Sequence, residues 1–461
     1  MPQEGKKFLQ IHKVNTKVAF AIPLWWRIQE TTFFGNLIMK NAVATKPVMA
    51  LPTIIMLGAL GMTGAVSANG TSSQSDDSAT LQDALRNGKL AFNFRYRFEN
   101  VDDDVRPEEA HASTLRSRIT YTTKNWNNLQ VQLEVDDVTV IGGNNYDDLN
   151  NHMTDHAVVA DPEGTEINQA WIAWSGLADT TMKYGRQRIN LDNQRFIGGV
   201  GWRQNEQTYD SFTITNQSLP NTTLFYGYIN NVNRIFGPDD GRTGTPAADV
   251  DWDSSADIIN INYRGLGIGT LSAYAYLLDL EDAPSASSKT YGVRLSGVQG
   301  KDTKWLYTAE YAWQSGYKDN PASYDADYYN LETGIQTKLL TARLGMDVLE
   351  ADDHAGVAFS TPLATLHKFQ GFADQFLNTP ATGIEDRYGS VEGKVFGALV
   401  QLTYHDFNAE EGNADYGDEI DIAIAKQVHK NVHLLLKYAN YNADDFGTDT
   451  QKAWLQVTVS F

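Results

Sequence analysis

The sequence contains no cysteine among its 461 residues. This absence excludes a disulfide framework, a zinc–thiolate site and a cysteine nucleophile. Basic residues are also scarce, since 37 Lys and Arg stand against 57 Asp and Glu, which gives a net charge of −20. A nucleic-acid partner is therefore not expected, because phosphate binding needs a basic surface. The mean hydropathy is negative and only one long apolar run is present, so a bundle of membrane helices is not expected either.

That apolar run, residues 51–66, lies between the basic residues Lys40 and Lys46 and the small residues that end at Ala68. The pattern predicts a secretory signal peptide over residues 39–68. The alternative is an N-terminal membrane helix, which the glycines and the small-residue end disfavour.

Residues 1–38 have no obvious role, and we interpret them as a misassigned upstream extension, since Met39 begins a complete signal by itself. Residues 69–88 are expected to form an N-terminal periplasmic segment. Residues 1–68 hold seven of the basic and two of the acidic residues, so the exported remainder carries a net charge of −25. An exported, acidic, cysteine-free chain fits the envelope of a Gram-negative bacterium.

Apolar and polar residues alternate through most of residues 89–461. Successive side chains of a strand point to opposite faces, so each alternating segment predicts a strand with one apolar and one polar face. About eighteen such segments are present: 89–99, 113–123, 127–136, 166–174, 181–189, 207–216, 222–230, 257–264, 268–278, 289–296, 303–314, 326–336, 338–348, 387–393, 397–406, 417–427, 431–440 and 451–461.

The connections between these segments alternate in length. Short turns follow the even-numbered strands, and long loops follow the odd-numbered ones, at 137–165, 190–206, 231–256, 279–288, 349–386 and 407–416. This pattern predicts an all-β fold, a single transmembrane antiparallel β-barrel of about 18 strands with long outer loops, in the Gram-negative outer membrane. A soluble β-sandwich is the alternative, and the lack of an interdomain linker disfavours it.

The expected partners follow from this fold. Outer-membrane lipid and lipopolysaccharide would surround the apolar face. Phe461 ends the chain in phase with an apolar strand, and we expect the barrel-assembly machinery to engage it. No cofactor is expected.

Two stretches resemble the alginate-export family of outer-membrane β-barrels. One is KYGRQRINLDNQRF at 183–196, continuing to GWRQNEQ at 201–207, and the other is FSTPLATLHKFQGFADQF at 359–376. The resemblance covers residues 89–461 and implies an eighteen-stranded porin-like channel, and the best-known member of the family secretes alginate through an arginine-rich lumen. This chain is more similar to the uncharacterised relatives than to that member.

If the apolar face meets lipid, the polar face lines the pore, and it carries many arginines for so acidic a chain. Rings of arginine select anions and bind carboxylates through two hydrogen bonds. We therefore predict passive transport of anionic saccharides, such as alginate or its oligomers. The residues expected to bind this substrate are Arg95, Arg97, Arg116, Arg118, Arg186, Arg188, Arg195, Arg203, Arg294 and Arg343.

Two conditions apply to these arginines. Arg186 and Arg188 share their parity with Met182 and Tyr184, so they reach the lumen only if Gly185 marks a bulge or Tyr184 also faces inward. Arg195 and Arg203 reach the lumen only if the loop from Asn190 to Glu206 folds back into it.

Alternatives remain open at this point. The arginines could pair with lumen carboxylates, which would indicate a general porin, or one specific for another substrate, with a charge-paired lumen. A plugged structural barrel and a barrel enzyme are further alternatives. Catalysis is not expected, because the sequence contains no Gly-x-Ser-x-Gly or His-Glu-x-x-His motif.

The segment 352–386 is long for a connection. Phe369, Phe372 and Phe376 stand at helical spacing, which predicts a short amphipathic helix. We expect this segment to form a constriction or gate in the barrel mouth, with His367, Lys368 and Asp374 as gating-loop residues; a lid that packs on the rim is the alternative.

Asp-rich runs at 147–148, 239–240 and 352–353 could hold calcium. None has the ligand spacing of a calcium-binding loop, so solvated loops, and no metal site, are expected there.

Overall fold

The computed structural model describes residues 77–238 and 249–461. The proposed signal peptide, the upstream extension and the Asp239-Asp240 pair lie outside these residues. In the described part, eighteen long strands form one antiparallel sheet. They are β1 (Lys89–Asp103), β2 (Ala110–Thr122), β3 (Leu129–Val140), β4 (Gly164–Leu177), β5 (Thr180–Gln187), β6 (Thr208–Asn216), β7 (Thr222–Asn233), β8 (Asp251–Tyr263), β9 (Thr270–Leu278), β10 (Ser288–Gly300), β11 (Lys304–Gly316), β12 (Asp325–Gln336), β13 (Leu340–Leu349), β16 (Ile384–Val395), β17 (Ala398–Asn408), β18 (Asp415–His429), β19 (Val432–Ala443) and β20 (Thr450–Ser460).

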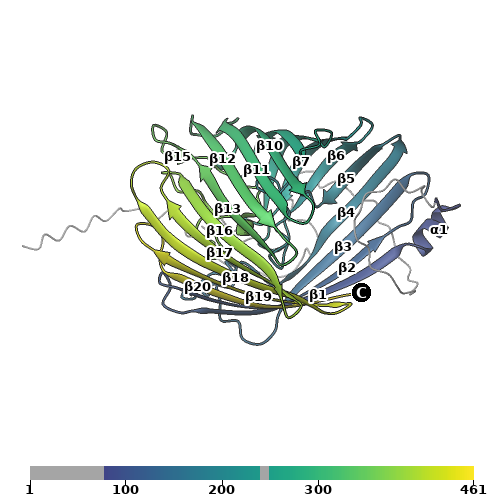
Figure 1. The fold of residues 1–461 in the computed structure, drawn as a ribbon. Coiled ribbons are helices and arrows are strands. Elements are labelled where there is room, and N and C mark those ends of the chain that lie inside the picture. Colours follow the sequence, from purple (N-terminus) through teal and green to yellow (C-terminus); the bar gives the residue numbers. More distant parts are fainter. Residues whose placement is uncertain (1–76, 239–248) are drawn as a thin grey trace, which may run out of the picture. The chain divides into compact units, whose positions relative to one another are not determined.

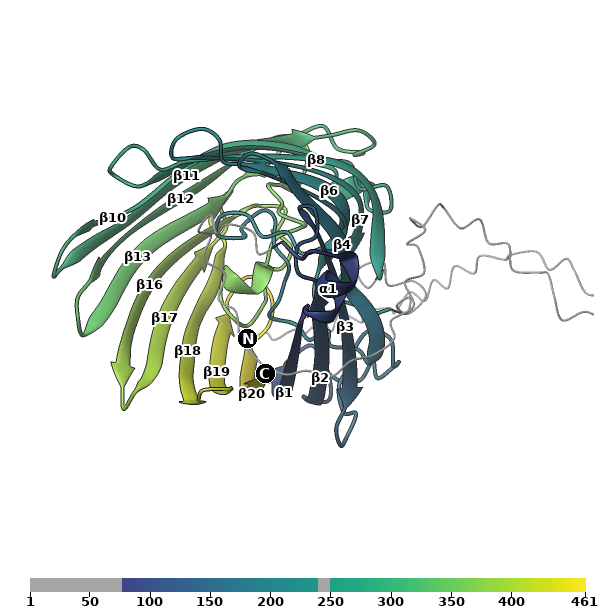
Figure 2. The ribbon, with the colours of Figure 1, turned by 90° about the vertical axis from the view of Figure 1, so that its right-hand side faces the viewer.

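The sheet closes on itself. Each strand pairs with the next along the chain, and β1 pairs with both β2 and β20, so that Arg97 stands opposite Thr114 on one side and Gln456 on the other. Figure 1 shows the wall from the side, and Figure 2 shows it from the end that carries α1 (Leu81–Arg86). The predicted antiparallel barrel is confirmed, because closure pairs every strand edge.

The remaining elements are small. A two-stranded hairpin, β14 (Ala351–Asp352) and β15 (Val357–Ala358), follows β13, and two 3-10 turns cover Pro284–Ala286 and Leu366–Lys368. Among the described residues, no helix has the length and apolar character needed to span a membrane.

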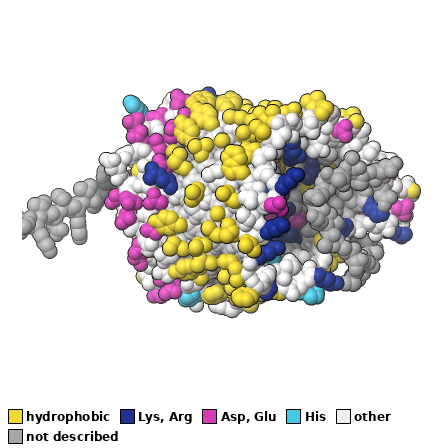
Figure 3. Space-filling model, in the orientation of Figure 1, with side chains coloured by type: hydrophobic (Ala, Val, Ile, Leu, Met, Phe, Trp, Pro, Cys, Tyr) yellow, Lys and Arg dark blue, Asp and Glu magenta, His cyan; other side chains and the backbone are white. Residues whose placement is uncertain are grey.

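The apolar face of the strands covers the outside of the barrel. Leu344 is 68% exposed and Ile119 is 47% exposed, whereas the lumen-facing Thr341 and Arg118 of the same two strands are at most 9% exposed. Figure 3 shows hydrophobic side chains over the middle of the outer wall, Asp and Glu side chains toward the end with the long loops, and Lys and Arg side chains at the hollow of the opposite end. An apolar outer belt of this kind is what a lipid bilayer requires of a barrel.

Glycines in the wall allow tyrosine rings to lie flat against its inner side. Gly345 stands opposite Tyr388, and Gly292 stands opposite Tyr274. A Cβ atom at either glycine would lie 2.2 to 2.3 Å from the ring of the opposing tyrosine. Larger residues there would push the rings into the lumen, so these glycines keep the interior space for the loops.

The main buried apolar cluster lies within the barrel. Its members come from the inner wall and from two long loops, and include Phe196, Tyr209, Trp252, Tyr274, Tyr276, Tyr328, Phe359, Phe376, Phe407, Tyr441 and Trp454. Period-two alternation assigns such inward aromatics to a polar face, so the sequence pattern did not predict this cluster. It forms because the loops supply apolar side chains that exclude water from this part of the lumen.

Leu344 and Leu339 offer a test of the membrane-facing wall. Leu344→Arg places a charge at the middle of β13 on the outer face, so we expect the free energy of unfolding to fall by about 2–4 kcal/mol. Leu339→Arg, in the exposed turn before β13, should cost less than about 1 kcal/mol. Urea titration in lipid vesicles measures both, and equal losses would contradict the assignment of the outer face.

Candidate functional site: two loops inside the barrel

Two long loops turn into the lumen. We name residues 188–207, between β5 and β6, loop A, and residues 359–383, between β15 and β16, loop B. Gln204 and Asn205 of loop A are fully buried, and Gln204 donates from Nε2 to Oγ1 of Thr114 on the inner wall (2.8 Å). The expectation that the stretch from Asn190 to Glu206 folds back into the lumen is therefore met.

Two arginines of β1 hold the main chain of loop A. Arg95 donates to the carbonyl oxygen of Gly201 (2.8 Å), to that of Arg203 and to Oε1 of Gln204 (2.9 Å). Arg97 donates to the carbonyl oxygen of Trp202 (2.5 Å). Three consecutive carbonyl groups of loop A thus find their donors on one strand. Buried carbonyl groups need such partners, so β1 fixes the position of this part of the loop.

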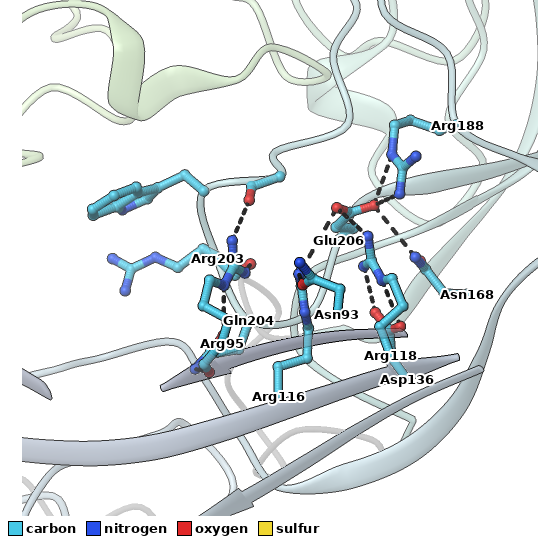
Figure 4. Close-up of polar contacts among 12 residues, drawn as sticks. Asn93, Arg95, Arg116, Arg118, Asp136, Asn168, Arg188, Arg203, Gln204 and Glu206 are labelled. Carbon is cyan, nitrogen blue, oxygen red and sulfur yellow. Dashed lines mark hydrogen bonds and ion pairs between the residues drawn. The ribbon is translucent and has the colours of Figure 1, made fainter. Parts of the chain in front are cut away.

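Glu206 of loop A is the acceptor for the arginines of β2 (Figure 4). Its Oε1 accepts from Arg118 (2.9 Å) and lies 3.8 Å from Nη1 of Arg116, and its Oε2 accepts from Nε of Arg188 (2.7 Å). Arg118 also donates to Asp136 (2.7 Å). Burial alone would raise the pKa of Glu206, but Arg118, Arg188 and Arg116 outweigh it and hold the pKa well below its usual range.

Arg203 joins loop A to the wall and to loop B. Its guanidinium lies 3.2 Å from Glu99 of β1 and 3.5 Å from Asp374 of loop B. Burial would lower the pKa of Arg203, but Glu99, Asp161 and Asp374 raise it above the ordinary value, so the side chain stays charged. Removing any one of these carboxylates would leave the buried positive charge less compensated.

Loop B packs against loop A along its length. The Leu363 carbonyl accepts from the Gly198 amide (2.9 Å), the Thr365 amide donates to the Gln194 carbonyl (3.0 Å), and Lys368 Nζ donates to the Asn193 carbonyl (2.9 Å). Loop B therefore lies within the lumen, as expected for a constriction, and not on the rim.

The amphipathic helix expected in loop B is absent. Only Leu366–Lys368 form a single 3-10 turn, and Gln370, Gly371 and Asp374 have positive φ angles of 50°, 78° and 60°. These conformations interrupt a helix. The prediction was wrong because the helical spacing of the phenylalanines reflects packing against different neighbours, not one helix face.

An aromatic stack lies where the two loops meet. The Trp202 ring stacks on His367 with centroids 4.3 Å apart and an angle of 5°, and His367 stacks on Phe372 at 5.2 Å. Lys437 Nζ of β19 lies 4.3 Å from the Trp202 ring centroid and 2.5 Å from Nε2 of His367. These contacts tie both loops to the wall.

The protonation state of His367 follows from its surroundings. Burial, opposed by Asp374 and reinforced by Lys437, lowers the pKa of His367 to about 3, so the ring is neutral at physiological pH. A neutral ring can donate from Nδ1 to Asp374 (2.7 Å) while Nε2 accepts from Lys437 (2.5 Å). Burial opposes ionisation of Asp374, but His367, Lys452 and Arg203 lower its pKa.

The structure places nine of the ten predicted arginines inside the barrel. The four of β1 and β2 are buried beneath loop A and hold it, and Arg188, Arg195 and Arg203 belong to loop A itself. On the inner wall, Arg294 pairs with Glu310 (2.5 Å) and Arg343 with Glu332 (3.6 Å), while Arg195 bonds Gln370 (2.9 Å) and lies 3.5 Å from Asp347. These contacts are those of a charge-paired lumen; the role of the arginines in substrate binding stays a prediction.

The tenth, Arg186, lies on the outer side of β5. Gln187 next to it is buried and accepts a hydrogen bond from Thr213 inside the barrel (3.2 Å), so Arg186 points the other way and pairs with Asp210 (2.9 Å). The prediction that Arg186 lines the lumen is wrong. Gly185 has a positive φ, but β5 pairs with β4 in regular register from Met182 to Arg186, so the alternation continues through Gly185.

Lys183 was not among the predicted site residues. It shares the inward parity of Gln187, and its Nζ lies 4.3 Å from the centroid of the Trp171 ring. In residues 77–238 and 249–461, neither Lys183 nor Lys368 has a carboxylate partner. The sequence could have indicated this position, because Lys183 stands between Met182 and Tyr184, and alternation with these two residues places it on the polar, inner face.

One group of acidic residues and histidine stands apart from the lumen. Asp352, Asp353 and His354 lie close together at the tip of the β14–β15 hairpin, where Asp353 and His354 are exposed. Exposed acidic groups need no ion, so the expectation of a solvated loop is unchanged.

A closed barrel of this strand number, with loops folded into its lumen, defines a porin-type channel. Solved structures share this architecture. They include OpdK of Pseudomonas aeruginosa with vanillate (TM-score 0.65, 14% identity, covering 82% of this chain and 99% of that chain) and OccK9 (OpdG) of the same organism (0.64, 14%, 82% and 99%). OccAB4 of Acinetobacter baumannii is similar too (0.63, 13%, 81% and 97%). At these identities the likeness concerns the fold alone.

The family model described as alginate export matches residues 87–351, and the chain belongs to this family. No curated protein matches the chain. The protein is a porin-type channel of the Gram-negative outer membrane, and family and fold point to a channel rather than an enzyme. The long loops accordingly face the outside, and the short turns face the periplasm.

The hold of Glu206 on loop A can be tested by its pH dependence. The pKa of Glu206 is lowered in the folded state. Its ion pairs therefore stabilise the fold fully at pH values above about 4.3, the usual pKa of a glutamate, and this stabilisation is lost as the pH falls through the lowered pKa of the folded state. Glu206→Gln should lower the free energy of unfolding at neutral pH by about 3–5 kcal/mol, and the difference from the wild type should shrink in acid.

Urea titration at several pH values measures this difference. Glu109→Gln, at a half-exposed site in an outer loop, is the control and should change little. A difference that stays constant into strong acid would contradict the ion-pair explanation.

Proposed function

We propose that the protein is a passive channel for small anionic saccharides, such as short uronate oligomers. The observation that carries this proposal is the pair of lumen lysines without carboxylate partners in the described residues, Lys183 and Lys368. Most of the lumen arginines, by contrast, pair with carboxylates, as Arg118 does with Glu206 and Arg294 with Glu310. An unpaired ammonium group in a confined passage attracts anions and raises their local concentration.

The inner wall formed by β8 and β9 also offers neutral hydrogen-bonding groups. Asn262 donates to Asn260 (2.6 Å), Ser272 donates to Asn262 (2.5 Å), and Asn260 donates to Asp192 of loop A (2.6 Å). Amide and hydroxyl groups of this kind match the donors and acceptors of sugar hydroxyls. They support a saccharide as the body of the transported anion.

The packed layer formed by loops A and B supports short solutes over a long polymer. Many residues of this layer are less than 10% exposed, among them Phe196, Ile197, Arg203, Gln204, Asn205, Glu206, Phe359, Leu363, His367, Gln370, Ala373 and Phe376. A solute must pass beside these side chains, which restricts its cross-section.

A second candidate is a small aromatic carboxylate. A cavity of about 910 Å³ lies on the outer side of the loops, and Phe236, Trp252, Phe376 and Leu377 are among its lining residues. Aromatic walls suit an aromatic ring, and OpdK, which shares the fold, was crystallised with vanillate.

The lysines provide the test. Lys183→Gln combined with Lys368→Gln should shift the reversal potential in planar bilayers toward cation selectivity and reduce galacturonate oligomer flux several-fold, because the unpaired charge is lost. Arg387→Gln, on the outer surface, is the matched control and should leave both unchanged.

Flux into liposomes separates the two candidate solutes. Trigalacturonate should pass faster than neutral maltotriose of the same length, and vanillate should not inhibit it. Faster vanillate flux, with inhibition of the sugar, would favour the second candidate, and an unchanged reversal potential in the double variant would overturn the role of the lysines.

A further inference from the structure

Loop B is held by two neighbouring carboxylates of β18. The main-chain amide of Phe372 donates to Oδ2 of Asp421 (3.1 Å), and that of Ala373 donates to Oε1 of Glu419 (2.7 Å). Glu419 and Asp421 lie two residues apart on one face of β18 and are 0% and 1% exposed. We call them the carboxylate pair. Two consecutive amides of loop B therefore depend on two adjacent acids of the wall.

Gly371 makes this contact possible. Its φ of +78° belongs to the left-handed region, and a Cβ atom would lie 2.3 Å from Oε2 of Glu419. The carboxylate is fully buried and accepts from the Ala373 amide, so moving it aside would break that bond. Only glycine meets both conditions, so the chain reaches the carboxylate pair closely enough to donate two amides.

The remaining oxygens of the carboxylate pair have no hydrogen-bond donor. Oε2 of Glu419 and Oδ1 of Asp421 are buried and unpartnered in the described residues. A buried acceptor without a donor, and still more a second buried charge beside the first, is costly. Something that the protein's other side chains do not supply must compensate these two oxygens.

The charged groups around the carboxylate pair are already engaged. On β17, His405 donates to Asp386 of β16 (2.9 Å) and lies 3.8 Å from Asp421. On β19, Lys437 bonds His367 (2.5 Å), and Tyr441 donates to main-chain carbonyls. In loop B, Asp374 pairs with Lys452 of β20 (3.2 Å) and Arg203 of loop A (3.5 Å), and Asp347 of β13 accepts from Gln370 (2.6 Å).

A metal ion does not fit this position. In residues 77–238 and 249–461, the only group of three His, Asp or Glu side chains with ligand atoms close enough for one ion is Asp352, Asp353 and His354. Two adjacent buried carboxylates can instead share one proton, which neutralises one charge and supplies the missing donor between them.

We propose that Glu419 and Asp421 share one proton and that this shared proton keeps loop B in the lumen, so that its loss releases loop B and widens the channel. When hydroxide removes the proton as water, two negative charges face each other without solvent. Hydration of both requires water to enter between β18 and loop B, which breaks the bonds from Phe372 and Ala373. The carboxylate pair is then a pH-dependent gate, whichever solute the channel carries.

Single-channel conductance in planar bilayers tests this. Wild-type conductance should rise several-fold between about pH 6 and about pH 10. Glu419→Gln, whose amide donates permanently to Asp421, should stay at the low value throughout. Gly371→Ala should stay at the high value, because its Cβ separates the loop from the pair. Gly356→Ala, at a positive-φ glycine in open space on the β14–β15 hairpin, should behave as the wild type.

Thiol labelling provides a second measurement, since the chain has no cysteine of its own. Ala373→Cys places a thiol against Glu419, and its rate of reaction with a membrane-impermeant thiol reagent should rise more steeply with pH than that of Leu377→Cys. Leu377 is 42% exposed, so Leu377→Cys corrects for the ionisation of the thiol itself. The Glu419→Gln background should abolish this difference. If gel mobility shows that Gly371→Ala does not form a barrel, the thiol-labelling result decides the proposal.

A flat pH profile in the wild type, or a profile unchanged by Glu419→Gln, would overturn the shared proton. A folded Gly371→Ala variant with wild-type conductance would overturn the role of the pair in holding loop B. None of these outcomes bears on ion selectivity, so failure here is distinguishable from failure of the proposed function.

Discussion

A guanidinium group inside a barrel needs acceptors for its N–H groups, and this requirement organises the lumen. The arginines of β1 and β2 point inward because the alternation of the strands demands it, and at this depth water no longer solvates them. Loop A meets the need with three carbonyl oxygens and Glu206. Once loop A is fixed, Arg203 and the Lys368–Asn193 contact position loop B, and the aromatic stack fills the space between them. The constriction follows from the need to satisfy buried charge.

The wall could be derived from the sequence almost completely. All eighteen expected strands are present, because lipid on one side and a polar interior on the other impose a period of two on every strand. The bounds differ mainly where strands continue beyond the membrane. The strand expected at 257–264 spans Asp251–Tyr263, and that expected at 113–123 spans Ala110–Thr122. In these extensions the buried inner face is apolar, as at Trp252 and Ala110, and the outer face is polar, so they lack the apolar outer face that marks a spanning segment.

The interior was harder to predict, for a physical reason. Its contacts join residues far apart in the chain, such as Arg95 with Gln204 and Arg195 with Gln370, and no local pattern encodes such pairs. Parity rules placed the arginines of β1 and β2 correctly but could not show that loop A covers them. Near Gly185 the sequence did not decide whether Arg186 faces the lumen or the outside, and only the strand register decided it. In loop B, the backbone conformation at Gly371 depends on carboxylates of β18, about fifty residues away along the chain.

The pairing of β1 with β20 also has a consequence for biogenesis. Arg97 bonds Gln456 of the last strand as well as Trp202 of loop A, and the Phe461 amide donates to the Phe92 carbonyl (2.9 Å). Contacts of such large sequence separation form late, because the ends of a long chain must first be brought together. The inner loops therefore reach their final anchorage only when the cylinder is sealed, so a half-inserted intermediate would have a wider and less selective interior than the mature channel.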